Sequence, residues 1–308
     1  MQNFGSLFTN GLLTETNLIH GRAMHTIDDH QRLWTRGAHS RLMLYQLPLQ
    51  SGSEPLREQI SLYWVDTPNV EIDYGCDQAL AFDPKSQTLW VFDNRHGRLL
   101  RISNPNDWQG KLLVDAVIGQ RNKTDAEANR GRDRPDASSL GHVADIRFDH
   151  HGNLFIVDNN YEGHPNGRIL AYLADDLARD SSLFPDIAAK KLFVADRFDQ
   201  TDIIRIHDPV DRPFSPVSIA FNSRNEMVVG NDGYYRNPQR RSVRQLYLYR
   251  HPLKKQTPDA VIELSLGAAG ELNFDQYDNL IVQDHTWVKT WVINYDRDPA
   301  WLHPLPAP

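Results

Sequence analysis

Two short apolar runs of this sequence contain polar side chains at alternate positions. Asp145 and Arg147 alternate with apolar residues in ADIRF, and Glu271 and Asn273 do so in ELNF. A β-strand places alternate residues on the same face, so each pair points one way. Carboxylate and amide oxygens are ligands of Ca²⁺, whereas an arginine among carboxylates forms ion pairs. The four residues are therefore candidates for a ligand or cation site, with Asp145, Glu271 and Asn273 as its metal ligands, or for a structural ion-pair cluster.

The elements that would position these residues repeat along the chain. Each copy has a short apolar run ending in Asp or Asn, a tight turn and a second apolar run, and a third run follows. Such runs are typical of β-strands, and Asp, Asn and Gly favour the turns between them. The copies are HTIDDHQRLWTRG (25–37), LAFDPKSQTLWVFD (80–93), IRFDHHGNLFIVD (146–158), IAFNSRNEMVVGN (219–231) and LNFDQYDNLIVQD (272–284).

The spacing of the repeats predicts the fold. The anchor residues Asp28, Asp83, Asp149, Asn222 and Asp275 lie 53 to 73 residues apart, enough for four strands and their loops. We therefore predict an all-β fold, a β-propeller with five clear four-stranded blades, in one domain over residues 1–308. The innermost strands would then bring the four polar side chains to the axial channel.

Other parts of this propeller are predicted from shorter signals. A sixth blade within 191–206 is an alternative to an outer strand there. We expect residues 1–20 to supply a closing strand, at 12–19, and residues 296–308 to form a Pro-rich tail. The predicted outer strands are 60–64, 112–118, 191–195 and 260–264.

One stretch resembles a known family. DAVIGQ (115–120), DASSLGHVADIRFDHHGNLFIVDNN (136–160) and NGRILAY (166–172) are similar to the bacterial NHL-repeat propellers. The resemblance implies a propeller of commonly six blades and favours a secreted protein over a cytoplasmic one. A lyase of that broader group uses histidines on inner strands, which makes His142 a candidate. The first, fourth and fifth copies lack the turn glycine of the family.

Long insertions indicate where a ligand would bind. Loops joining the second strand to the third, and one blade to the next, share a face of a propeller, and long loops in compact domains are often functional. The insertions are 119–141, 159–167, 196–215 and 231–243. Exposed-loop variation is the alternative explanation. The candidate ligand-binding residues of this face are His142, Asn159, Asp232, Tyr234, Tyr235 and Arg236, together with Arg134.

Composition excludes several classes of protein. The net charge of −7 disfavours nucleic-acid binding, which requires a basic surface. The lone cysteine, Cys76, excludes an intrachain disulfide and a CxxC zinc site. No apolar run is long enough to span a membrane, and the first residues do not resemble a signal peptide. The sequence also lacks GxSxG, HExxH and nucleotide-binding motifs.

Three functional hypotheses remain. The first is a binding module that holds a protein, peptide or glycan through the inserted loops. The second is a metal-dependent propeller hydrolase or lyase, with Ca²⁺ at the axial channel. The third is a structural domain of a larger assembly. Pairing of Glu271 with Arg147 would count against the second.

Overall fold

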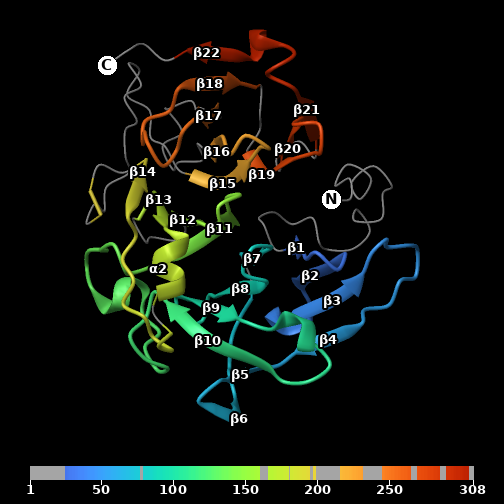
Figure 1. Ribbon diagram of the computed structural model, residues 1–308, viewed down its shortest axis with the longest axis vertical. Helices are drawn as coiled ribbons and strands as arrows, with labels where there is room; N and C mark the ends of the chain where they lie inside the picture. Colours follow the sequence, from blue (N-terminus) through green and yellow to red (C-terminus); the bar gives the residue numbers. More distant parts are fainter. Residues whose placement is uncertain are drawn as a thin grey trace, which may run out of the picture.

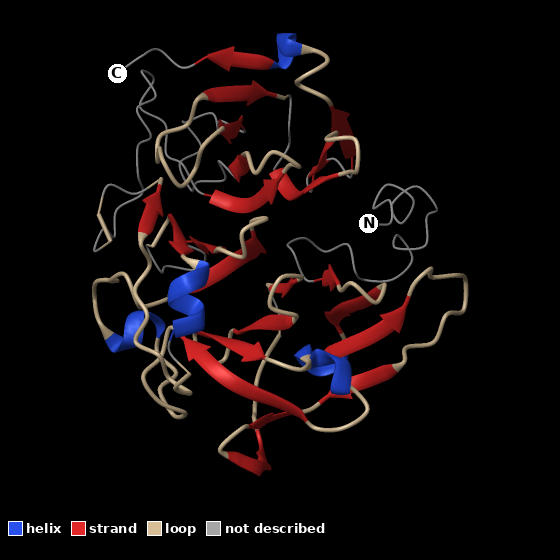
Figure 2. Ribbon diagram, viewed as in Figure 1, coloured by secondary structure: helices blue, strands red, loops and turns tan. Residues whose placement is uncertain are grey.

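The computed structural model describes residues 25–76, 79–159, 166–179, 181–194, 197–198, 216–231, 245–264, 269–284 and 289–304. The described chain forms five β-sheets around a common centre, each with one strand nearest to it (Figure 1). Helix is almost absent (Figure 2). The prediction of an all-β, five-bladed propeller is confirmed. No helix in the described ranges has the length and apolar character needed to cross a bilayer.

The first two blades illustrate the plan. Consecutive antiparallel strands run from the axis to the rim. Blade one consists of β1 (His25–Ile27), β2 (Arg32–Arg36), β3 (Leu42–Gln46) and β4 (Arg57–Ile60). Blade two consists of β7 (Leu80–Asp83), β8 (Thr88–Asp93), β9 (Arg98–Ile102) and β10 (Leu112–Ile118), with β5 (Leu62–Trp64) and β6 (Thr67–Glu71) beyond β10.

The remaining blades follow the same order. Blade three consists of β11 (His142–Phe148), β12 (Leu154–Asn159), β13 (Arg168–Tyr172) and β14 (Lys191–Phe193). Blade four consists of β15 (Pro216–Phe221), β16 (Met227–Asn231), β17 (Gln245–Tyr249) and β18 (Ala260–Glu263), with β22 (Leu302–Pro304) on its outer edge. Blade five consists of β19 (Ala269–Phe274), β20 (Leu280–Asp284) and β21 (Lys289–Ile293).

Short helical segments lie in the connections. The α-helix α2 (Ala174–Arg179) begins after β13, and two acidic residues in its first turn favour the positive end of its dipole. The 3₁₀ segments are η2 (Ala38–Ser40), η3 (Pro105–Asp107), η4 (Ala128–Gly131) and η5 (Pro299–Trp301).

Two predicted strands lie elsewhere than expected. The segment 60–64 is divided: β4 ends at Ile60, and β5 pairs in parallel with β10 of the next blade. The predicted tail 296–308 contains β22, which pairs with β18 while Trp301 and Leu302 pack on the blade-four core. The predicted closing strand 12–19 lies outside the described residues.

The outer strands of blades two, three and four are confirmed at β10, β14 and β18. Strand β14 pairs with β13 as the outer strand of blade three, as expected if 191–206 does not begin an extra blade.

Apolar side chains fill the spaces between blades. Four hydrophobic clusters of the described residues join consecutive blades, from blade one to blade five. Trp34 in β2 and Trp90 in β8 are almost fully buried in two of these clusters. Burial of such surface at roughly 25 cal/mol per Å² provides the main stabilisation of the ring.

The first hairpin turns of blades one, three, four and five have the same construction, whereas the turn of blade two is one residue longer, and its Asp83 accepts from Lys85 N and Ser86 N. Asp149 Oδ1 accepts hydrogen bonds from the backbone N–H groups of His151 (2.8 Å) and Asn153 (2.9 Å). One turn residue per blade adopts a positive φ, and it is a glycine only in blade three. These residues are Gln31, Gln87, Gly152, Asn225 and Asp278. The missing glycines of the other copies therefore do not change the turn.

Blade four keeps the side-chain pair of this turn with donor and acceptor exchanged. In blade three, Asn153 Nδ2 donates to Asp149 Oδ2 at 2.8 Å. In blade four, Asn222 holds the aspartate position, and its Nδ2 donates to Oε2 of the buried Glu226 at 2.6 Å. Arg224 and Arg250 form ion pairs with the same carboxylate.

This exchange predicts strong coupling between positions 222 and 226. Asn222→Asp should destabilise the protein by about 1–3 kcal/mol, because it removes a donor and places two carboxylates side by side. The double substitution Asn222→Asp/Glu226→Asn restores the pair found in blades three and five. A double-mutant cycle by urea unfolding should therefore give a favourable coupling energy of about 1 kcal/mol or more. Additive effects of the two substitutions would contradict this prediction.

Candidate functional site

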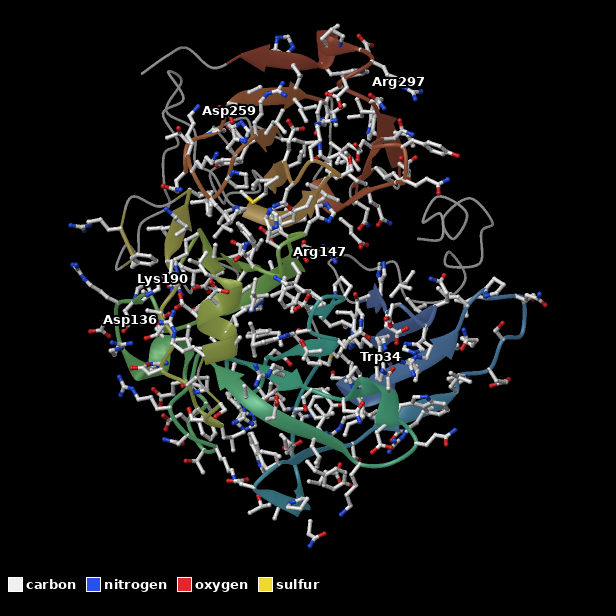
Figure 3. The ribbon with its side chains drawn as sticks, in the orientation of Figure 1. Trp34, Asp136, Arg147, Lys190, Asp259 and Arg297 are labelled. Carbon is white, nitrogen blue, oxygen red and sulfur yellow. The ribbon has the colours of Figure 1, made fainter. Side chains whose placement is uncertain are left out.

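The structure brings the four predicted polar side chains together at the axis. Asp145 and Arg147 lie on β11, and Glu271 and Asn273 lie on β19. Figure 3 shows Arg147 close to the centre of the ring. His25 of β1 joins them, with Nε2 3.3 Å from Glu271 Oε1. We call these five residues the axial cluster.

Glu271 is the centre of the axial cluster. Its Oε1 accepts a hydrogen bond from Asn273 Nδ2 at 3.1 Å and lies 3.4 Å from Arg147 Nη2. Together with His25, these contacts join blades one, three and five through one oxygen atom. The Glu271 residue is only 5% exposed, so the ion pairs are screened little by solvent.

Asp145 is the most buried acid of the axial cluster. Its Oδ2 accepts a hydrogen bond from the backbone N–H of Ile219 on β15, at 3.0 Å. Its Oδ1 accepts no hydrogen bond within the described chain, and Arg147 Nε lies 3.6 Å from it. Burial raises the pKa of Asp145 to about 6, although the charge of Arg147 and the Ile219 hydrogen bond partly oppose the shift. Ser218 Oγ, on the adjacent strand, is also buried without a hydrogen-bond partner among the described residues.

Arg147 forms ion pairs with both carboxylates of the axial cluster. Its Nε lies 3.6 Å from Asp145 Oδ1, and its Nη2 lies 3.4 Å from Glu271 Oε1. These contacts are the ones that the ion-pair alternative predicts. Calcium binding by Asp145, Glu271 and Asn273 stays a prediction, and the contacts of Arg147 count against it, because a positive side chain repels a cation.

A second group of buried charges supports the face that carries the predicted insertions, which we call the loop face. At the ends of the second strands, Asp93 pairs with Arg98 and Asp158 pairs with Arg168, with N–O distances of 2.9 Å. All four side chains are almost fully buried. Each aspartate also accepts a hydrogen bond from a glycine N–H that precedes the inner strand of the same blade. The recurring turn residues are thus structural.

Loop 119–141 is anchored on this support. Gln120 Nε2 donates to the carbonyl oxygens of His96 and Glu127, at 2.8 and 2.9 Å. Arg168 donates through Nη1 to Asp136 O at 3.0 Å and through Nη2 to Ser139 O at 2.9 Å. The loop crosses from the outer strand of blade two to the inner strand of blade three, so these bonds fix it along its length.

The middle of loop 119–141 has a constrained backbone. Asn129 and Arg130 both have positive φ, at 54° and 58°. The side chain of Asn129 exchanges two hydrogen bonds with that of the buried Asn166, which also donates to Asp158 Oδ2 at 3.0 Å. A positive φ in two consecutive residues without glycine costs free energy, which this buried network offsets.

The other predicted site residues have different outcomes. His142 is half-buried at the start of β11, and it pairs in register with Asn159, which is buried at the end of β12. Arg134 is exposed on loop 119–141. Four further candidates lie outside the described residues, namely Asp232, Tyr234, Tyr235 and Arg236.

Three site residues were not predicted from the sequence, namely His25, Asn129 and Asn166. His25 lies two positions from Ile27, on the face of β1 opposite to Thr26, and nothing in its local sequence marks it as a partner of Glu271. Asn166 and its pair Asn129 are 37 residues apart in loops of no regular pattern. The sequence did point to Gln120, because a Gly–Gln pair precedes the long polar loop in the NHL-type repeats that this chain resembles.

Comparisons with known proteins assign no family to this chain. No family model and no curated protein matches this sequence, so the NHL assignment stays a prediction. The similar solved structures include the β-propeller domain of Myceliophthora thermophila Cps50 (Swd1), with 13% identity, a TM-score of 0.47, and coverage of 86% of this chain and 67% of that chain.

Two further structures have comparable scores. A putative gluconolactonase has 13% identity and a TM-score of 0.47, covering 91% of this chain and 78% of its own. A catalytically inactive virginiamycin B lyase from Staphylococcus aureus, solved with quinupristin, has 13% identity and a TM-score of 0.44, covering 95% and 73%.

The environment of Asp145 predicts a specific dependence of stability on pH. Its pKa in the folded protein, about 6, lies above the ordinary value of 3.8. The folded state therefore holds the proton more tightly, and stability falls as pH rises between these values. Asp145→Asn keeps an acceptor for Ile219 N–H but cannot ionise. From pH 4 to pH 7, wild type should lose up to about 3 kcal/mol of unfolding free energy relative to this variant.

Urea unfolding of both proteins at intervals of pH measures this difference. Asp29→Asn, which alters an exposed carboxylate, is the matched control and should show no such trend. A difference between wild type and Asp145→Asn that stays constant over this range would show that Asp145 ionises normally.

Proposed function

We propose that this protein is a non-catalytic binding module, which holds a protein, peptide or glycan on its loop face. The observation that carries the proposal is the anchoring of loop 119–141. A long loop without regular structure is held by buried amide and arginine side chains at both ends and in its middle. Fixing a loop before binding lowers the entropy cost of association.

The exposed part of this loop is suited to contact a partner. Arg132, Asp133 and Arg134 are exposed in sequence, between the anchored Asn129 and the buried Pro135. Arginine is enriched at interfaces because its planar guanidinium forms several hydrogen bonds and stacks on aromatic groups. Arg132 also takes part in the anchoring, because its Nε donates to Asn129 O at 3.4 Å and its Nη2 forms an ion pair with Asp136 at 2.5 Å.

The axial cluster supports binding rather than catalysis. A catalytic carboxylate must be free to bind a metal, a proton or a substrate. Glu271 instead contacts His25, Arg147 and Asn273, and Asp145 accepts from the backbone of blade four. We propose that the cluster joins blades around the axis.

A ligand selection tests the function of the loop face. A phage-displayed random peptide library and a glycan array are screened against the wild-type protein. The affinity of the selected ligands should fall at least about tenfold in Arg132→Ala/Arg134→Ala, because truncation of a central interface arginine commonly costs more than 1 kcal/mol. Gln276→Ala/Tyr277→Ala, on an exposed first-hairpin turn of blade five, is the matched control and should bind as wild type does. Ligands that bind all three proteins equally would refute the proposal.

The role of the axial cluster is tested separately. Glu271→Gln should lower the unfolding free energy by about 3 kcal/mol, because it removes the nearer of the two carboxylates that pair with the largely buried Arg147. Calcium should leave the melting temperature of wild type unchanged. A calcium-dependent rise in wild type that is lost in Glu271→Gln would instead favour the metal-dependent alternative.

A further inference from the structure

One exposed triplet of loop 119–141 has the sequence of an acceptor for an N-linked glycan. Asn122, Lys123 and Thr124 form Asn-x-Thr, and no other Asn-x-Ser or Asn-x-Thr triplet occurs among the 308 residues. Transfer of a glycan requires an exposed asparagine amide and the hydroxyl of the third residue. Asn122 and Thr124 are both exposed, in the part of the loop that follows β10. The triplet therefore lies on a surface that another enzyme can reach.

The side-chain amide of Asn122 faces the hydroxyl of Thr124. Asn122 Oδ1 accepts hydrogen bonds from Thr124 Oγ1 and from Thr124 N, each at 2.9 Å. It also accepts a hydrogen bond from Asp125 N at 2.9 Å. All three donors meet the amide oxygen, and Asn122 Nδ2 forms no hydrogen bond within the described part of the chain. The nitrogen that would carry a glycan is therefore available to a second molecule.

Lys123, the middle residue, holds the triplet on blade two. Its carbonyl oxygen accepts a hydrogen bond from Nη1 of the buried Arg98 at 2.8 Å. Its Nζ donates to Asp66 Oδ1 at 2.6 Å and lies 5.3 Å from the centre of the Trp64 ring. These contacts fix the backbone of the triplet, and they use neither of the exposed side chains on the two sides of Lys123. The acceptor is thus presented by a fixed part of the loop.

We propose that Asn122 is the acceptor of an N-linked glycan, which a separate enzyme transfers from a lipid-linked sugar diphosphate. Asn122 Nδ2 attacks C1 of the first sugar, so that an N–C1 bond forms and the bond between C1 and the phosphate oxygen breaks. The lipid diphosphate leaves, and the proton lost from Nδ2 goes to a base of the transferase. The donors on Asn122 Oδ1 stabilise the negative charge that the amide oxygen gains during this step.

This modification site is independent of the ligand proposed for the loop face. The glycan would stand on the first part of loop 119–141, beside the β5–β6 turn that Lys123 contacts, whereas the exposed arginines follow Asn129. This class of transfer takes place outside the cytosol, so it requires export of the chain, which the resemblance to NHL-type propellers favours. The alternative is a structural turn alone, because asparagine side chains cap loops without any modification.

Mass spectrometry of the full chain from the cells that produce it tests the proposal directly. The peptide that contains residues 122–124 should have the mass of the unmodified peptide plus that of a glycan. Fragmentation of this peptide should place the first sugar on Asn122. An unmodified Asn122 in this protein would overturn the proposal, whichever ligand the loop face binds.

Glycan transfer to the purified, unmodified protein tests the geometry. The folded protein is incubated with a single-subunit oligosaccharyltransferase and a lipid-linked oligosaccharide. Thr124→Val, which replaces the hydroxyl by a methyl group, should lower the transfer rate at least about tenfold, since it removes a hydrogen bond to Asn122 Oδ1. Thr124→Ser keeps the hydroxyl and should be modified at nearly the wild-type rate. Equal rates for wild type and Thr124→Val, or transfer to a peptide of residues 119–127 but not to the folded protein, would overturn the proposal.

Further variants separate the acceptor from its surroundings. Thr124→Val should melt near the wild-type temperature, because both backbone hydrogen bonds to Asn122 Oδ1 remain. Asn69→Gln is the matched control, since Asn69 is an exposed asparagine without a hydroxyl residue two positions later, and it should be modified as wild type is. Arg132→Ala/Arg134→Ala should also accept the glycan, so the two proposals can fail separately. A glycan that persists in Asn122→Gln would place the modification elsewhere and overturn the proposal.

Discussion

The carboxylate of Glu271 is the contact on which the arrangement of the ring depends. Through one oxygen it meets His25 of the first blade, Arg147 of the third and Asn273 of its own strand. Apolar clusters join each blade to the next along the sequence, but these contacts are non-directional. The contact of Glu271 with His25 is directional and links the first and last blades, so it favours one angle at which the sheets close around the axis. Buried ion pairs contribute little to net stability, so we assign them a role in the specificity of the arrangement.

The same division between apolar packing and polar fixing recurs in each blade. Branched and aromatic residues face the neighbouring sheets. Their packing requires only that they are buried, and it does not select particular partner groups. The turn carboxylates and the buried Asp–Arg pairs specify which backbone groups meet. Blade four shows that the interaction is needed rather than the residue, because Asn222 and Glu226 exchange donor and acceptor. The motif residues of a repeat can therefore change while the structure of its turn is retained.

The parts of this structure that could be predicted from sequence are those set by local periodicity. Alternation places Asp145, Arg147, Glu271 and Asn273 on the axial face of their strands, and turn chemistry locates the hairpins. The sequence could not predict which sheet β5 joins. A strand of its composition could pair equally well with the outer edge of blade one or of blade two. β22 was missed for a different reason, because its proline-rich sequence does not show the pattern of a strand. His25 was missed because its partner lies more than two hundred residues away.

The loop face combines an irregular backbone with fixed side-chain anchors. Buried amides hold Asn129 and Arg130 at positive φ, which suits recognition of one particular shape. Lys123 extends this anchoring to the rim of blade two, because it belongs to loop 119–141 and donates to Asp66 in the turn before β6. A ligand that rearranges the loop would therefore also disturb the β5–β6 hairpin, whereas a ligand that fits the loop as it stands would leave that hairpin unchanged.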